Sequence, residues 1–198
     1  MAELSEVRKA LAYYLTRPVV RLVAKAPVTP DAISWFGFSL TFAAAVLVFT
    51  GHLFAAGFVV LVAGFCDILD GALARDINRA NRSGAVLDSI LDRLSESVLL
   101  LGILVFYARE QAVVEILVVG LALISSLMVS YIKARAEAMG LECQVGLFTR
   151  AERVVVLALG LLLSQIDYAL ITALAIIVVF SFITLIHRLV YVQRQIKD

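Results

Sequence analysis

The segment from Asp67 to Arg93, DILDGALARDINRANRSGAVLDSILDR, concentrates charge in a chain that is otherwise strongly apolar. Of the 198 residues, 62% are hydrophobic, and the mean hydropathy is +0.98. Soluble domains have an apolar share of roughly 45–50%. No Asp, Glu, Lys or Arg occurs in 32–66 or in 168–187, and uncharged runs of about 18 or more residues are typical of membrane-spanning helices. The sequence therefore predicts an integral membrane protein with an unusual charged segment.

Turn signals on either side of this segment divide the chain into apolar stretches of helical length. We expect an all-α protein with six transmembrane helices, at approximately 31–50, 54–79, 83–108, 112–139, 149–164 and 168–190. The first helix has a clear start, since Thr29 can serve as N-cap and Pro30 suits the first helical turn. These six helices form the predicted domain, 31–198.

Residues 1–30 are predicted to form an amphipathic juxtamembrane arm. Leu4, Val7 and Leu11 recur at helical spacing with a polar opposite face, as in a helix that lies on a membrane surface. With six spans, all 17 Lys and Arg except Arg109 lie on one side or in the half of a span nearest to it. The positive-inside rule makes that side, with both termini, cytoplasmic in a multi-pass plasma-membrane protein.

The four aspartates of the central segment fall into two pairs. Asp67 and Asp70 are three residues apart and Asp88 and Asp92 are four apart, so each pair lies on one helix face. A turn at 79–83 makes the two helices antiparallel and brings the pairs to similar depth. Converging carboxylates repel one another unless cations lie between them, and Mg²⁺ or Mn²⁺ prefer such oxygen ligands. The alternative is that these are solvated charges at helix ends that pair with nearby arginines.

Small residues beside the aspartates indicate close approach of a ligand to the backbone. Gly71 directly follows Asp70, and Gly84 precedes Asp88 by four residues. Glycine costs roughly 1 kcal/mol in a helix, which ligand contact or tight helix packing would each explain. Arg75, five residues after Asp70, suits phosphate oxygens.

Taken together, Asp67-x-x-Asp70-Gly71-x-x-Ala74-Arg75 followed by Gly84-x-x-x-Asp88-x-x-x-Asp92 resembles the signature of the CDP-alcohol phosphotransferases. The eight residues between Arg75 and Gly84 match the usual gap, and the six-span layout with an N-terminal surface helix covers essentially the whole chain. The resemblance implies a membrane enzyme that displaces CMP from a CDP-linked lipid with an alcohol. It also implies a homodimer in which each protomer holds its own site.

The resemblance further assigns roles to single residues. Asp67, Asp70 and Asp88 are expected to hold a centre of two ions, with Asp92 near the second ion. Asp92 is also the expected general base for the acceptor hydroxyl, so Asp88 and Asp92 are the catalytic candidates. The residues expected to line the CDP site are Gly71, Ala74, Arg75 and Gly84.

A second group of charges bears on the acceptor alcohol. Basic residues near the cytoplasmic helix ends suit a phosphorylated acceptor, although ordinary positive-inside topology also explains them. The group comprises Lys133, Arg135, Arg150, Arg153 and Arg188. The stretches SYIKARAEA and RAER resemble the phosphatidylinositol-phosphate and archaetidylinositol-phosphate synthase branch. That resemblance implies that Lys133, Arg153 and Arg188 bind inositol 1-phosphate, with Arg135 and Arg150 assisting.

Three other functions compete with this reading. A synthase that uses glycerol 3-phosphate would also need a basic pocket. A divalent-cation transporter could use four carboxylates, but transporter sites lie near the bilayer midplane and these aspartates lie near helix ends. An inactive scaffold is disfavoured because no signature aspartate is missing. A net charge of +1 gives no indication of nucleic-acid binding.

Overall fold

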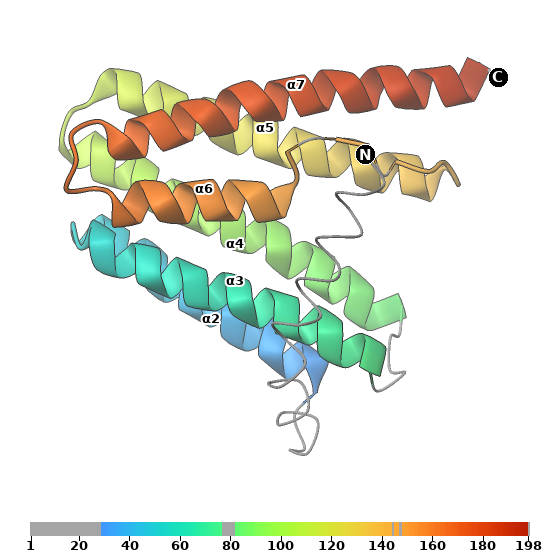
Figure 1. Cartoon of the computed structure of the whole chain (residues 1–198), viewed down its shortest axis with the longest axis horizontal. Coiled ribbons are helices and arrows are strands. Elements are labelled where there is room, and N and C mark those ends of the chain that lie inside the picture. The colour runs from blue at the N-terminus through green and yellow to red at the C-terminus, as the bar shows by residue number, and fades with distance from the viewer. Residues whose placement is uncertain (1–28, 77–81, 144, 147, 198) are drawn as a thin grey trace.

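The computed structural model describes residues 29–76, 82–143, 145–146 and 148–197. Residues 1–28 of the predicted arm at 1–30 lie outside the described residues. Within the described part the chain is entirely helical (Figure 1). Its six helices are α2 (Pro30–Phe49), α3 (Leu53–Asp76), α4 (Arg82–Arg109), α5 (Val113–Ala138), α6 (Arg150–Leu162) and α7 (Ala169–Lys197). Each predicted span corresponds to one of these helices, and α7 continues past the predicted end at residue 190.

Local sequence signals explain where the helices begin. Pro30 occupies the first turn of α2, and the Thr29 hydroxyl accepts a hydrogen bond from the Ala32 amide at 3.3 Å, as the sequence predicts. At the start of α6, the Thr149 amide donates to Glu152 Oε2 at 2.8 Å in a capping box. These caps satisfy amides that have no partner within their own helix and fix where each helix starts.

Four of the described helices are long and apolar enough to cross a membrane: α2, α3 up to Asp70, α5 and α7. The remaining two have clear physical reasons for failing that criterion. Helix α4 carries the charged residues of the central segment in its first half, and α6 has only 13 residues. At 1.5 Å per residue, α6 is about 20 Å long, shorter than a hydrocarbon core of about 30 Å.

The helices pack into a bundle in which α2 lies against α3 and α4, α6 lies between α3 and α7, and α5 contacts α4 and α7 (Figure 1). Its core contains Val48, Leu100, Ile103, Leu161 and Leu174, all buried. Small residues bring neighbouring helices close together.

One such close contact joins α2 and α4 through Gly102. A Cβ atom added there would lie 2.9 Å from the Ala45 carbonyl oxygen. The same packing sets the direction of each helix. The C-terminal end of α3 lies near the N-terminal ends of α2 and α4 at one end of the bundle, and α6 begins beside the C-terminal half of α3 (Figure 1).

Candidate active site

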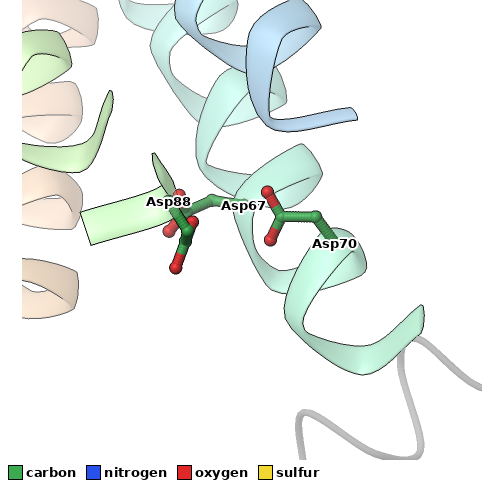
Figure 2. Close-up of side chains that lie close together, drawn as sticks. All are labelled: Asp67, Asp70 and Asp88. Carbon is green, nitrogen blue, oxygen red and sulfur yellow. The ribbon is translucent and has the colours of Figure 1, made fainter. Parts of the chain in front are cut away.

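Three aspartates converge at this end of the bundle. Asp67 and Asp70 come from α3 and Asp88 from α4, and one carboxylate oxygen from each lies within 4.8 Å of the other two. Figure 2 shows the Asp67 and Asp88 carboxylates side by side, with Asp70 one helical turn further along α3. Asp70 is 4% exposed, whereas Asp67 and Asp88 are half-buried. The donor set fits a hard divalent cation, because closely spaced carboxylate oxygens would otherwise repel one another.

Helix α2 supports this cluster through Ser34. Its hydroxyl lies 2.6 Å from Asp70 Oδ2 and donates to that oxygen. Ser34 also lies 3.2 Å from the carbonyl oxygen of Pro30 in the first turn of α2. The contact fixes the orientation of a buried carboxylate, as outer residues do for ligands in metal sites.

The fourth aspartate, Asp92, joins the cluster through an arginine. Arg150 Nη1 donates to Asp67 Oδ2 at 2.7 Å and also forms an ion pair with Asp92. Arg150 thus bridges α3 and α4 from the first residue of α6. The aspartates of α3 and α4 thus lie close together, as predicted. Among the described basic residues, Arg150 is the one that forms ion pairs with these aspartates.

One turn deeper, a second ion pair joins α6 to α4. Arg153 Nε lies 2.5 Å from Glu96 Oε1, and Arg153 Nη2 lies 2.7 Å from Glu96 Oε2. Arg153 is 1% exposed, and the Glu96 side chain is 9% exposed. A bidentate pair of this kind fixes the plane of the guanidinium as well as its position.

These groups line a single cavity between α2, α3, α4 and α6. Its polar lining comprises Ser34, Thr41, Asp67, Asp70, Asp88, Asp92, Ser95, Glu96, Arg150 and Arg153. Its remaining lining is apolar and includes Phe38, Val60 and Leu99. A polar end beside an apolar wall suits a ligand with a charged head and a lipid tail.

The predicted CDP-site residues lie on the helices next to the aspartates. Gly71, Ala74 and Arg75 continue α3 beyond Asp70, and Gly84 lies in the first turn of α4. The side chains of Ala74 and Arg75 lie outside the described residues, so their predicted contacts with CDP stay predictions.

The predicted acceptor residues divide into two groups. Arg150 and Arg153 line the cavity, whereas Lys133, Arg135 and Arg188 are not part of its described lining. Lys133 is 3.7 Å from Glu137 in an exposed ion pair, and Arg135 is exposed near the end of α5.

Arg188 has a different environment from the other basic residues. It is 5% exposed, and its guanidinium donates to the carbonyl oxygens of Val145 at 2.8 Å and Val129 at 2.7 Å. These contacts join α7 both to the loop before α6 and to α5. A structural contribution of Arg188 is therefore visible in addition to its predicted role.

Sequence reasoning missed two polar contacts, those of Ser34 and Glu96. The only signal for Glu96 is its spacing, since it lies four residues after Asp92 and so continues the face of α4 that carries the aspartates. Ser34 stands in an uncharged apolar stretch, where nothing in the sequence indicates which helix it faces.

A family model described as CDP-alcohol phosphatidyltransferase matches residues 27–190. The chain belongs to this family. The transferase is similar to two named relatives over most of its length. It is 36% identical over 188 residues to the archaetidylinositol phosphate synthase of Methanothermobacter thermautotrophicus, with 91% of this chain and 94% of that protein covered. It is 35% identical to the phosphatidylinositol phosphate synthase of Mycobacteroides abscessus, with 88% and 82% covered.

Solved structures extend the similarity to the fold. The phosphatidylinositol phosphate synthase PgsA1 of Mycobacterium tuberculosis with CDP-DAG bound superposes on the transferase with a TM-score of 0.82. The two are 34% identical, and the match covers 90% of this chain and 94% of that chain. The same enzyme in complex with manganese and citrate gives a TM-score of 0.81. The transferase thus shares both its fold and its family with an enzyme crystallised with a CDP-linked lipid and with a divalent metal.

Proposed function

We propose that the protein transfers the lipid phosphatidyl or archaetidyl group of a CDP-linked lipid to inositol 1-phosphate and releases CMP. The observation that carries this proposal is the convergence of the signature carboxylates of α3 and α4 on a cavity that also contains Arg150 and Arg153. The names of its relatives support inositol phosphate as the acceptor. One relative is named for an archaetidyl product and the other for a phosphatidyl product. Both CDP-archaeol and CDP-diacylglycerol are therefore candidate donors.

The aspartates would hold the metal that this chemistry requires. We propose two ions, Mg²⁺ or Mn²⁺, held by Asp67, Asp70 and Asp88, with Asp92 beside the second. When bound, such ions neutralise the charge of a pyrophosphate and stabilise the departing phosphate oxygen. Gly71, Ala74, Arg75 and Gly84 would bind the CDP group at the adjacent ends of α3 and α4.

The reaction is a displacement at the lipid-side phosphorus. An inositol hydroxyl oxygen attacks that phosphorus, and its bond to the CMP oxygen breaks as CMP leaves. Asp92 takes the hydroxyl proton, a role for which its place at the edge of the aspartate cluster is suitable. Arg150 contacts both Asp67 and Asp92, so it would orient these carboxylates and could add positive charge near the reacting phosphate.

The basic residues would hold the acceptor. Arg153 lies inside the cavity, and we assign Lys133 and Arg188 to the same phosphate, with Arg135 assisting. Substitution of Lys133 or Arg153 by Ala should mainly raise KM for inositol 1-phosphate, because a lost phosphate contact weakens binding of the acceptor more than that of the donor. Unchanged acceptor KM in both variants would remove these residues from the site.

The wider assignment concerns the membrane. We propose that α4 and α6 complete six spans in one domain, 31–198, and that residues 1–30 form a helix on the membrane surface. The distribution of Lys and Arg supports an active site and both termini on the cytoplasmic side of the plasma membrane. We also propose a homodimer with one site in each protomer.

Release of CMP by the purified protein tests this function. The protein is incubated with CDP-diacylglycerol and Mg²⁺, and inositol 1-phosphate, glycerol 3-phosphate, free inositol and serine are compared as acceptors. CMP release with inositol 1-phosphate alone is the expected result. CMP release only with glycerol 3-phosphate would refute inositol 1-phosphate as the acceptor. No CMP release with any of the four acceptors, with either CDP-diacylglycerol or CDP-archaeol as donor, would refute the proposed reaction.

A further inference from the structure

The ion pair between Arg153 and Glu96 has features that protein stability does not explain. Arg153 lies one turn after Arg150 on α6, and Glu96 lies one turn after Asp92 on α4. The two helices therefore carry two successive ion pairs, the first at the aspartate cluster and the second deeper in the same cavity. The first is explained by its contact with the cluster, whereas among the described residues the second forms no hydrogen bond or ion pair with a signature aspartate.

Glu96 uses its whole carboxylate on one edge of the arginine. Its two oxygens accept from Nε at 2.5 Å and from Nη2 at 2.7 Å. This side-on arrangement leaves the other terminal nitrogen, Nη1, outside the pair. Among the residues that the structure describes, none accepts a hydrogen bond from Arg153 Nη1, although that atom is buried.

This arrangement is costly if it serves folding alone. Burying two charges carries a large desolvation penalty before they attract each other, and apolar residues of similar size are often as stable. A buried donor without a partner adds its own desolvation penalty to that cost. A bound anion in the cavity would satisfy Nη1 and offset that cost, because a charge-assisted hydrogen bond is stronger than a neutral one.

We propose that Glu96 is a positioning residue that holds Arg153 in the one orientation in which its Nη1 edge meets the phosphate of the acceptor. This inference rests on the proposed function, in which Arg153 binds that phosphate. Without Glu96, the flexible arginine side chain is attracted to the neighbouring carboxylates of Asp92 and Asp67 and leaves the acceptor site. Glu96 therefore acts on acceptor affinity through Arg153 and not on the CDP-linked lipid.

Steady-state kinetics of CMP release with Glu96→Gln test this role. Gln keeps the size of the side chain, but its amide can accept only one of the two hydrogen bonds and brings a donor toward Nη2. We expect KM for inositol 1-phosphate to rise about tenfold, the effect of roughly 1.4 kcal/mol, while KM for CDP-diacylglycerol changes less than about twofold. Glu96→Asp, which retains the charge, should recover part of the acceptor affinity.

Two further variants separate positioning from stability. Glu110→Gln makes the same chemical change at an exposed turn at the far end of α4 and should leave both KM values unchanged. In the Arg153→Gln background, adding Glu96→Gln should not raise acceptor KM further, because residues that act through one contact are not additive. The double variant also removes both buried charges, so if it folds where a single variant unfolds, the loss of fold is due to an uncompensated buried charge, and Glu96→Asp then carries the kinetic test.

The outcomes distinguish this inference from the proposed function. An equal rise of donor and acceptor KM, or additive effects of the two substitutions, would refute the positioning role. A parent enzyme that uses only glycerol 3-phosphate would refute the proposed acceptor, and the same comparison would then be made with that phosphate monoester. Thermal stabilisation by inositol 1-phosphate gives a measurement without turnover, and we expect Glu96→Gln to need about tenfold more of this ligand than the parent enzyme for the same shift.

Discussion

Replacement of Asp88 by Asn should have opposite effects on stability with and without divalent metal. One oxygen of Asp88 lies within 4.8 Å of oxygens of both Asp67 and Asp70. Two like charges about 5 Å apart repel by about 3 kcal/mol at an effective dielectric constant of about 20. Because Asp88 is half-buried, solvent reduces that figure, and we expect a net gain of roughly 1 kcal/mol for the neutral isostere in metal-free protein. That gain corresponds to an apparent unfolding midpoint about 2–4 °C higher.

The measurement is thermal unfolding of the parent and of Asp88→Asn in the same detergent, once with EDTA and once with Mn²⁺. The parent should gain stability on addition of Mn²⁺ because binding to the folded state is favoured, and the variant should gain little and lose CMP release. Asp167→Asn, an exposed change in the turn before α7, is the matched control and should behave as the parent does. A variant that is no more stable than the parent in EDTA and still responds fully to Mn²⁺ would refute Asp88 as a ligand.

Two more predictions concern the support of the site and the packing of the helices. Ser34→Ala removes the hydrogen bond to Asp70 and should weaken Mn²⁺ binding by about tenfold or more, as measured by calorimetric titration. Ser39→Ala loses only a hydrogen bond within α2 and should leave Mn²⁺ binding unchanged. Gly102→Ala forces α4 away from α2 and should destabilise the protein by about 1–3 kcal/mol. Gly120→Ala meets no atom within 4 Å and should raise the unfolding midpoint slightly; equal midpoints for the two glycine variants would contradict the close packing.

The sequence predicted the helices well because their signals are local. Uncharged apolar runs and turn residues such as Gly51 and Gly140 mark the ends of elements without any knowledge of tertiary structure. Both glycines adopt positive φ angles, 86° and 75°, which explains why they stop the helices beside them. Helix α7 extends beyond the predicted end at residue 190 because the polar residues after the apolar run remain helical.

The convergence of Asp67, Asp70 and Asp88 was also predictable, since helical spacing on two consecutive antiparallel helices suffices to bring them together. The partners of the arginines were not predictable. Arg150 and Arg153 are three residues apart with the same charge, yet one lies on the aspartates and the other pairs with Glu96. The difference depends on the register between α6 and α4, which packing decides. Arg188 likewise binds carbonyl oxygens of a loop and of α5, and no sequence pattern identifies such contacts.

The most direct test of the account is detection of the lipid product by mass spectrometry. The purified protein is incubated with CDP-diacylglycerol, inositol 1-phosphate and Mn²⁺, in parallel with Asp88→Asn. We predict that a phosphatidylinositol phosphate accumulates in an amount equal to CMP in the parent reaction and is absent from the reaction of the variant. CMP released without that lipid, or the lipid formed equally by Asp88→Asn, would contradict it.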